Sequence, residues 1–149
     1  MKVKRKDYLF VTIQFVLFFC FIFDLNWSLK LFFWIQITGL FIAILGGIII
    51  LLALLQLNKN LSPFPTQKES ATLIETGLYK FIRHPIYLGI ILLTFGIAFY
   101  LDSSYKLILS FILLILFFLK TQFEEKQLEI NYSNYLEYKL KTGRFFPKL

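Results

Sequence analysis

The residue types best suited to chemistry gather in one segment, Gly77–Gly89, with the sequence Gly-Leu-Tyr-Lys-Phe-Ile-Arg-His-Pro-Ile-Tyr-Leu-Gly. Arg83 and His84, the only histidine in the chain, come directly before a long apolar run. Pro85 suits the first turn of a helix, because its missing N–H would have no partner there. Free N–H groups at such a helix start attract anions, and the ring of Tyr87 can cover a flat or cationic group. The segment therefore predicts a ligand site at the mouth of an apolar helix, although each residue alone is also typical of a membrane anchor.

A pair of adjacent carboxylates, Glu124 and Glu125, forms the second candidate, and tyrosines follow it at positions 132, 135 and 138. Two carboxylates at the end of an apolar span can face a bound cation or ribose hydroxyls. Consecutive residues of a helix point about 100° apart, so at most one of the two can face a given ligand. The alternative is an ordinary solvated helix face, and the pair alone does not decide between the two.

Other kinds of site lack their sequence patterns. The chain contains no GxGxxG, no GxxxxGK[ST] and no GxSxG, so Rossmann, P-loop and nucleophile-elbow sites are not predicted. No group of His, Cys and carboxylate residues has metal-ligand spacing, and the single Cys20 excludes a disulfide framework. The net charge is +7, but the basic residues lie at the ends of apolar blocks, so we expect membrane headgroups and no nucleic acid as their partners.

Four apolar blocks must position these residues. The chain is 58% hydrophobic, more than a soluble domain of 149 residues can bury. Since backbone groups in lipid must be paired within the segment, we predict an all-α, polytopic membrane bundle with four spans and a cytoplasmic helix at the C-terminus. As one domain, residues 1–149 divide into spans at 8–24, 30–57, 85–101 and 104–123, a loop at 58–84 and a tail at 124–149.

Further expectations concern particular residues of these segments. Residues 122–140 should form one helix, and Gly46 and Gly47 should allow close helix packing. Lys106 and Lys120 should snorkel to the interfaces. The proline-containing segment 62–66 is a candidate for a mobile lid.

The distribution of basic residues predicts the orientation. The N-terminal tail and the loop 58–84 carry four each, the segment from Lys120 onward carries six, and the two other turns carry only Lys30 and Lys106. The positive-inside rule then places both termini in the cytoplasm. We expect a multi-pass protein of a prokaryotic cytoplasmic membrane.

Two motifs carry a resemblance to a known family. Gly77–Gly89 resembles the G-x-Y-x-x-x-R-H-P-x-Y-x-G signature of the isoprenylcysteine carboxyl methyltransferase family and of related phospholipid methyltransferases. The tail resembles that family's closing pattern, E-E-x-x-L, then Y-x-x-Y, then R-F-x-P, and the similarity spans Thr72–Pro147. Two departures stand out. Tyr132–Tyr135 lacks a glycine usual in the family and is one residue shorter, and Lys120 is the only cation where eukaryotic members carry an arginine that holds the substrate carboxylate.

The resemblance implies a helical membrane bundle whose cytoplasmic ends enclose S-adenosylmethionine. Carried over residue by residue, it implies a cofactor site made of Leu73, Ile74, Tyr79, His84, Pro85, Tyr87, Glu124 and Glu125. We assign catalytic roles to Arg83, which by its charge can hold a carboxylate, and to His84, the natural base for an amine acceptor. The implied reaction is methyl transfer to a lipophilic or prenylated acceptor from the bilayer, such as the carboxylate of an isoprenylcysteine-like substrate.

Three alternatives remain open at this stage. A phospholipid amine N-methyltransferase would use the same cofactor. Membrane sterol reductases share a similar R-H-P-x-Y segment and use NADPH, although their chains are longer. A non-catalytic membrane protein is the third, and the sequence does not set the oligomeric state.

Overall fold

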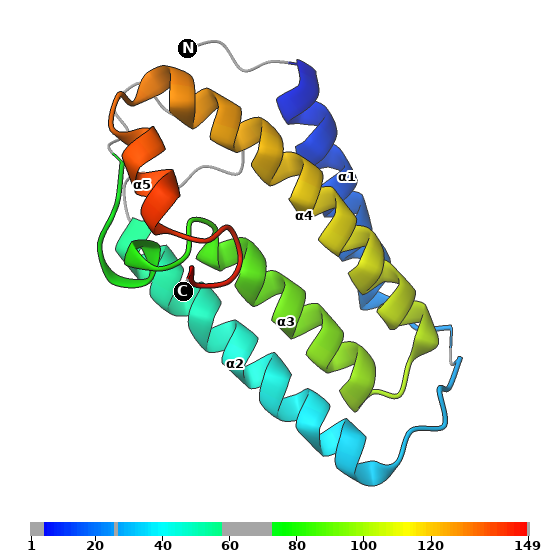
Figure 1. Cartoon of the computed structure of the whole chain (residues 1–149). Helices are drawn as coiled ribbons and strands as arrows, with labels where there is room; N and C mark the ends of the chain where they lie inside the picture. Colours follow the sequence, from blue (N-terminus) through cyan, green and yellow to red (C-terminus); the bar gives the residue numbers. More distant parts are fainter. Residues whose placement is uncertain (1–4, 26, 58–72, 149) are drawn as a thin grey trace.

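The described part of the chain folds into helices, and the four longest run side by side (Figure 1). The computed structural model describes residues 5–25, 27–57 and 73–148, and the candidate lid at 62–66 lies outside them. The helices are α1 (Arg5–Ile22), α2 (Phe33–Leu57), the short 3-10 helix η2 (Gly77–Lys80), α3 (Pro85–Tyr100), α4 (Ser104–Asn131) and α5 (Tyr135–Lys141). Within the described ranges there are two isolated β-bridges but no strand. The predicted all-α class is therefore confirmed.

Small residues bring α2 and α3 into close contact along their length. A Cβ atom added to Gly46 would lie 2.5 Å from the backbone nitrogen of Leu93 and 2.6 Å from the carbonyl oxygen of Gly89. Gly39 meets the backbone of α3 in the same way two turns earlier. The predicted role in packing therefore belongs to Gly46 and Gly39, whereas a Cβ on Gly47 would meet nothing within 4 Å.

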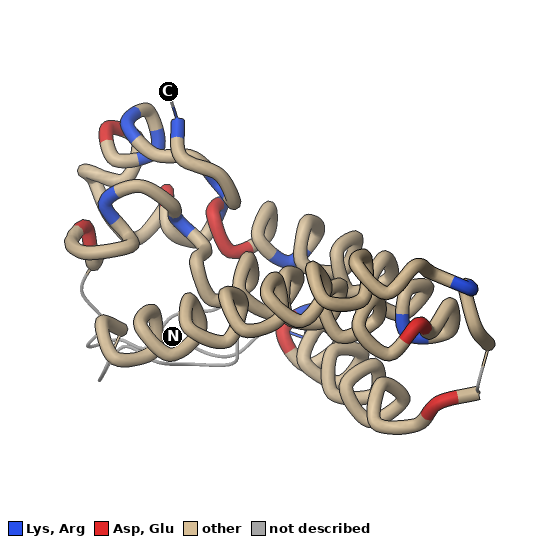
Figure 2. Tube along the Cα trace, turned by 90° about the horizontal axis from the view of Figure 1, so that it is seen from below, with Lys and Arg blue, Asp and Glu red and all other residues tan. Residues whose placement is uncertain are grey.

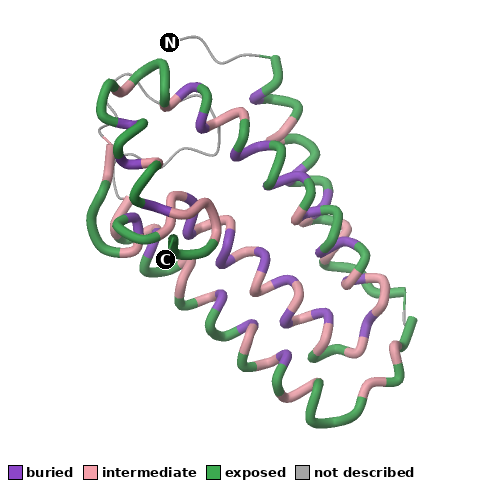
Figure 3. Tube along the Cα trace, viewed as in Figure 1, coloured by how far each residue is buried: buried purple, intermediate pink, exposed green. Residues whose placement is uncertain are grey.

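The outer faces of the helices are apolar and exposed. Large side chains on the outside of α2, such as Trp34, Phe41 and Leu55, remain uncovered by protein (Figure 3). Helices α2 and α4 are long and apolar enough to cross a membrane, and α3 is a shorter apolar helix of 16 residues. Most charged residues lie towards the two ends of the helices (Figure 2). An exposed apolar surface between two charged ends is typical of an integral membrane protein whose middle part faces lipid.

At the end of the bundle far from the termini, polar contacts connect the turn between α3 and α4 with α1 and with the segment between α1 and α2. Asp102, in the turn between α3 and α4, accepts hydrogen bonds from Ser28 and from the backbone nitrogen of Leu31. The ammonium of Lys106 donates to the carbonyl oxygens of Phe21 and Phe23 at the end of α1. Lys106 is thus buried as a cap of α1 and does not snorkel, which corrects our expectation.

The C-terminal region also differs from the prediction of one helix over 122–140. Helix α4 continues out of its apolar part to Asn131, Tyr132 takes an extended conformation (φ −127°, ψ 116°), and α5 begins at Tyr135. The intervening Tyr-Ser-Asn sequence has poor helix propensity, which permits the break. The break turns α5 back so that Tyr135 and Tyr138 become buried.

The glycine contacts generate a matched prediction. Gly46→Ala should destabilise the protein by about 1–3 kcal/mol, because the new methyl group meets the α3 backbone, which has no room to move. Gly47→Ala faces open space and should leave stability unchanged or raise it by up to about 1 kcal/mol through helix propensity. Thermal unfolding of the two variants in detergent measures the difference. Equal melting temperatures would contradict the proposed backbone contact.

Candidate active site

The last residues of the chain run across the start of α3. We call residues 142–147 the C-terminal strap. The backbone nitrogens of Arg83 and His84 donate to the carbonyl oxygens of Gly143 (2.9 Å) and Arg144 (3.1 Å). Gly143 donates in return to the carbonyl oxygen of Phe81 (3.2 Å). These bonds satisfy backbone groups just before a helix start and fix the strap beside His84.

Glu125 is the electrostatic centre of this region. Its side chain is only 2% exposed, and it accepts hydrogen bonds from Arg83 Nε (3.0 Å) and from two nitrogens of Arg144 (3.1 and 2.9 Å). The ammonium of Lys139 lies 3.5 Å from the same carboxylate. Arg83 Nη1 also donates to the carbonyl oxygens of Lys139 and Thr142. Glu125 thereby joins α4, α5, the strap and the start of α3.

Glu124 faces a different way. It accepts a hydrogen bond from the hydroxyl of Tyr87 (3.2 Å), and its Oε2 lies 3.8 Å from His84 Nδ1. On the other side of the imidazole, His84 Nε2 lies 3.4 Å from Glu125 Oε1, but this buried nitrogen makes no hydrogen bond within the described residues. The imidazole of His84 therefore lies between two carboxylates, that of Glu125 in the ion-pair network and that of Glu124 on the opposite side.

A cavity of about 260 Å³ opens beside these groups. It is lined by residues of all four long helices and of η2: Gln14, Leu57, Tyr79, Arg83, His84, Pro85, Ile86, Tyr87, Ile90, Lys120 and Glu124. The ring of Tyr87 stacks on His84 and, at 4.8 Å between centroids, on Phe117. The cavity lining thus combines charged and polar groups with aliphatic and aromatic side chains.

A buried lysine lies on the bundle side of the cavity. The ammonium of Lys120 donates to Gln14 Oε1 (2.7 Å) and lies 5.2 Å from the centre of the Tyr87 ring. Lys120 is only 1% exposed, so the expectation that it snorkels to the interface is wrong. The polar partner on α1 explains the difference, because it lets the ammonium stay inside the bundle.

The 3-10 helix η2 is positioned from two sides. Gly77 has a φ of +61°, a conformation that favours glycine, and Leu78 N donates to Gln56 Oε1 of α2 (2.8 Å). Tyr138 donates its hydroxyl to the carbonyl oxygen of Tyr79 (2.6 Å). Burial, and next the charge of Glu124, raises the pKa of Tyr79, while burial raises the pKa of Tyr138 to about 12. Both phenols therefore stay neutral at physiological pH.

Most of the residues selected from the sequence lie together. Of the nine positions, six line the cavity: Tyr79, Arg83, His84, Pro85, Tyr87 and Glu124. Glu125 lies beside His84 but does not line the cavity. Leu73 and Ile74 precede η2 in the chain, are half-buried, and do not line the cavity either. The sequence did not lead us to select Gln14 or Gln56, and it did not predict the bonds between Arg144 and Glu125. The first two had a usable signal, because an uncharged polar side chain inside an apolar block usually has a specific partner.

Comparison with known proteins gives a family and a fold. The model of the family described as phospholipid methyltransferase matches residues 34–135, about two thirds of the chain. Among solved structures, the chain is similar to the eukaryotic intramembrane Ras methyltransferase, isoprenylcysteine carboxyl methyltransferase, with a TM-score of 0.72 and 20% identity. That match covers 99% of this chain and 54% of the other, so the chain spans about half the length of the structure it resembles. No curated protein sequence gives a significant match.

The Glu125 network generates a prediction about stability. Glu125→Gln removes the negative charge and leaves the buried guanidinium of Arg83 without its carboxylate partner, and loss of one partner of a buried pair typically costs about 3–5 kcal/mol. We expect a lower melting temperature and faster proteolytic cleavage of the strap in detergent. The exposed ion pair of Glu137 and Lys141 provides the control, and Glu137→Gln should change neither measurement. If Glu125→Gln behaves like the control, the network does not hold the strap.

Proposed function

The chain belongs to the phospholipid methyltransferase family, and on this premise we propose that it is an S-adenosylmethionine-dependent methyltransferase for a lipophilic acceptor held in the membrane. The observation that carries the proposal is the meeting of the two motifs at one cavity. His84 and Tyr87 from one motif and Glu124 from the other lie within hydrogen-bonding or ion-pairing range of each other, although about 40 residues separate them in the chain.

The lining of the cavity fits the proposed cofactor. Neutral aromatic rings and a carboxylate are the groups that attract a sulfonium cation, and Tyr79, Tyr87 and Glu124 supply them. The imidazole of His84 adds a polar ring, whose Nδ1 lies on the side of Glu124. When bound, S-adenosylmethionine supplies a methyl group that the acceptor takes by direct displacement, with S-adenosylhomocysteine as the leaving product.

The chain's own residues divide the remaining tasks. Arg83 lines the cavity, but its Nε and Nη1 groups are bonded to Glu125 and to strap carbonyls. We therefore assign it a positioning role that keeps His84 and the strap in place. His84, between two carboxylates, is suited to accept a proton, which an amine acceptor must lose. The strap fixes the backbone of Arg83 and His84, and the Tyr87 ring stacks on the imidazole and holds its orientation in the cavity lining.

The proposed acceptor approaches from the bilayer, because part of the cavity lining comes from apolar side chains of the long helices, Leu57, Ile86 and Ile90. A carboxylate acceptor of the isoprenylcysteine kind is our first candidate. It needs no base, and the ammonium of Lys120 in the cavity lining is a cation that can attract such an anion. A phospholipid amine is the second candidate and is favoured by the surroundings of His84.

The proposed topology has four spans and both termini on the cytoplasmic side. The helices α1, α2 and α3 begin and end within three residues of the predicted spans, whereas α4 continues eight residues past 123. The described chain begins and ends on the same side of the bundle, where α3 starts (Figure 1). A single membrane domain in the cytoplasmic membrane accounts for the basic residues at that end.

Cofactor binding tests the function directly. Titration of the detergent-purified protein with S-adenosylmethionine in a calorimeter should give binding that weakens about tenfold or more in His84→Ala and in Tyr87→Ala, a loss of about 1.4 kcal/mol or more. Tyr100→Ala, at the opposite end of α3, should bind normally. Binding of NADPH in place of S-adenosylmethionine would move the protein to the reductases, and equal binding by all variants would refute the site.

Labelling in intact cells tests the topology. In a Cys20→Ala background, which removes the only cysteine, a membrane-impermeant maleimide should label Lys30→Cys from outside. Glu137→Cys should react only after permeabilisation. Labelling of Glu137→Cys in intact cells would reverse the proposed orientation.

A further inference from the structure

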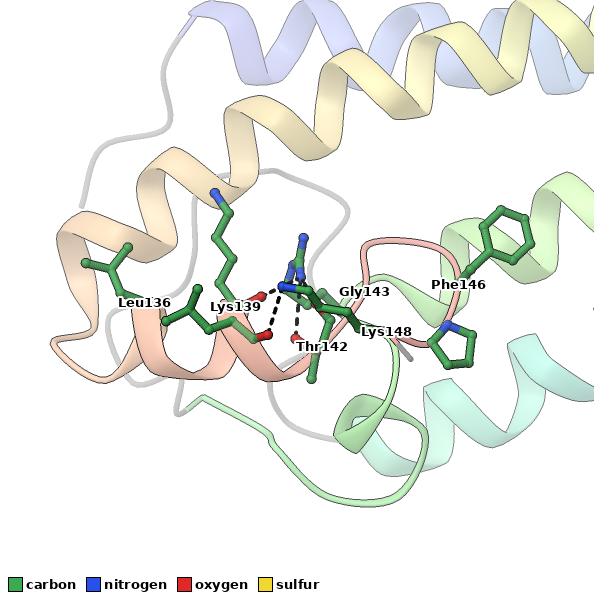
Figure 4. A pocket seen from close by; sticks show the side chains of 9 residues that line it. Leu136, Lys139, Thr142, Gly143, Phe146 and Lys148 are labelled. Carbon is green, nitrogen blue, oxygen red and sulfur yellow. Dashed lines mark hydrogen bonds between the residues drawn. The ribbon is translucent and has the colours of Figure 1, made fainter.

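A second hollow, separate from the cavity, lies on the outward side of α5 and the strap (Figure 4). Its volume is about 720 Å³, and it is lined by Arg83, Leu136, Lys139, Leu140, Thr142, Gly143, Phe146, Pro147 and Lys148. Three of these residues are cationic, and none is a carboxylate. The methyltransferase proposal does not require this surface.

The apolar part of this surface is large for so short a helix. Leu136 and Leu140 lie one turn apart on the same face of α5, and Phe146 belongs to the strap. Their exposed fractions are 60%, 71% and 73%. The opposite face of α5 is already buried through Tyr135 and Tyr138. A contiguous apolar patch beside cations is typical of a binding surface.

The height of the surface relative to the membrane follows from backbone hydrogen bonds. Residues 143 and 144 are bonded to residues 81–84, which directly precede the apolar helix α3. In the proposed four-span topology, on which this inference rests, the strap therefore lies at the depth of the lipid headgroups. Helix α5 has seven residues and is about 10 Å long, so its apolar face stays within reach of that layer.

The charges select among the partners such a face could bind. Lys139 bonds Glu129 (2.7 Å) and approaches Glu125, while Lys148 Nζ has only the carbonyl oxygen of Leu140 among its described partners (2.9 Å). A second copy of the chain in a two-fold interface would oppose lysine to lysine across the patch. An anionic headgroup layer offers the complementary charge and an apolar layer directly beneath it.

We propose that this surface binds anionic lipid headgroups of the cytoplasmic leaflet. Leu136, Leu140 and Phe146 insert at the boundary of headgroups and acyl chains, and Lys148 contacts lipid phosphates. The strap is then held from two sides, by Glu125 within the protein and by lipid outside it. The proposal does not depend on the identity of the cofactor or the acceptor.

Depth-dependent quenching in liposomes tests this surface with the full chain. In the Cys20→Ala background, Leu140→Cys and Phe146→Cys carry a small fluorophore, and Glu137→Cys, on the same helix outside the hollow, is the matched control. Spin-labelled lipid should quench the first two about twofold or more over the control, while aqueous iodide should favour the control. Adding phosphatidylglycerol to phosphatidylcholine should increase the lipid quenching, and Lys148→Gln should reduce that increase.

Other outcomes overturn the proposal. Strong iodide quenching of both labels would show that the surface faces water. Protection of both labels from iodide and lipid would show that protein covers it, either a second copy or another part of the chain. Equal lipid quenching with and without phosphatidylglycerol would refute the anionic preference.

Discussion

One buried carboxylate holds the candidate site together. Removing Glu125 from water is costly unless cations surround it, and here Arg83, Arg144 and Lys139 do so. Since these partners come from the start of α3, the strap and α5, the same ion pairs that stabilise the charge also fix three segments against α4. The orientation of His84 follows, because its backbone nitrogen is bonded to the strap.

The membrane part of the fold provides the second half of the frame. Gly39 and Gly46 let α2 approach α3 closely, while α1 packs on α4 through contacts that include the buried Gln14 and Lys120. The cavity lies where these two pairs of helices meet, with walls from both. The two pairs of helices therefore contribute differently to the site. The closely packed pair α2 and α3 fixes the start of the helix that follows His84. The pair α1 and α4 places the buried ammonium of Lys120 in the cavity lining.

Much of this arrangement could be predicted from the sequence, because hydrophobic length and motif residues are local signals. The observed α2 and α3 begin and end within three residues of the predicted spans, and His84, Tyr87 and Glu124 meet as the motifs implied. The break at residues 132–134 could not be predicted, because a periodic pattern continued across it and only the burial of Tyr135 and Tyr138 decides the turn. The burial of Lys120 also depended on a partner 106 residues away.

The two adjacent glutamates show how helix geometry allots different roles to identical side chains. Because neighbouring residues point about 100° apart, Glu124 lines the cavity while Glu125 points into the ion-pair network. Glu125 is bonded to two guanidinium groups, whereas Glu124 accepts from the hydroxyl of Tyr87 and lies 3.8 Å from His84 Nδ1, so Glu124 has the weaker cationic partners. The pairing of Glu125 therefore makes the carboxylate of Glu124 the one that a cationic ligand would meet. His84 lies beside both carboxylates and so connects the cavity lining to the ion-pair network.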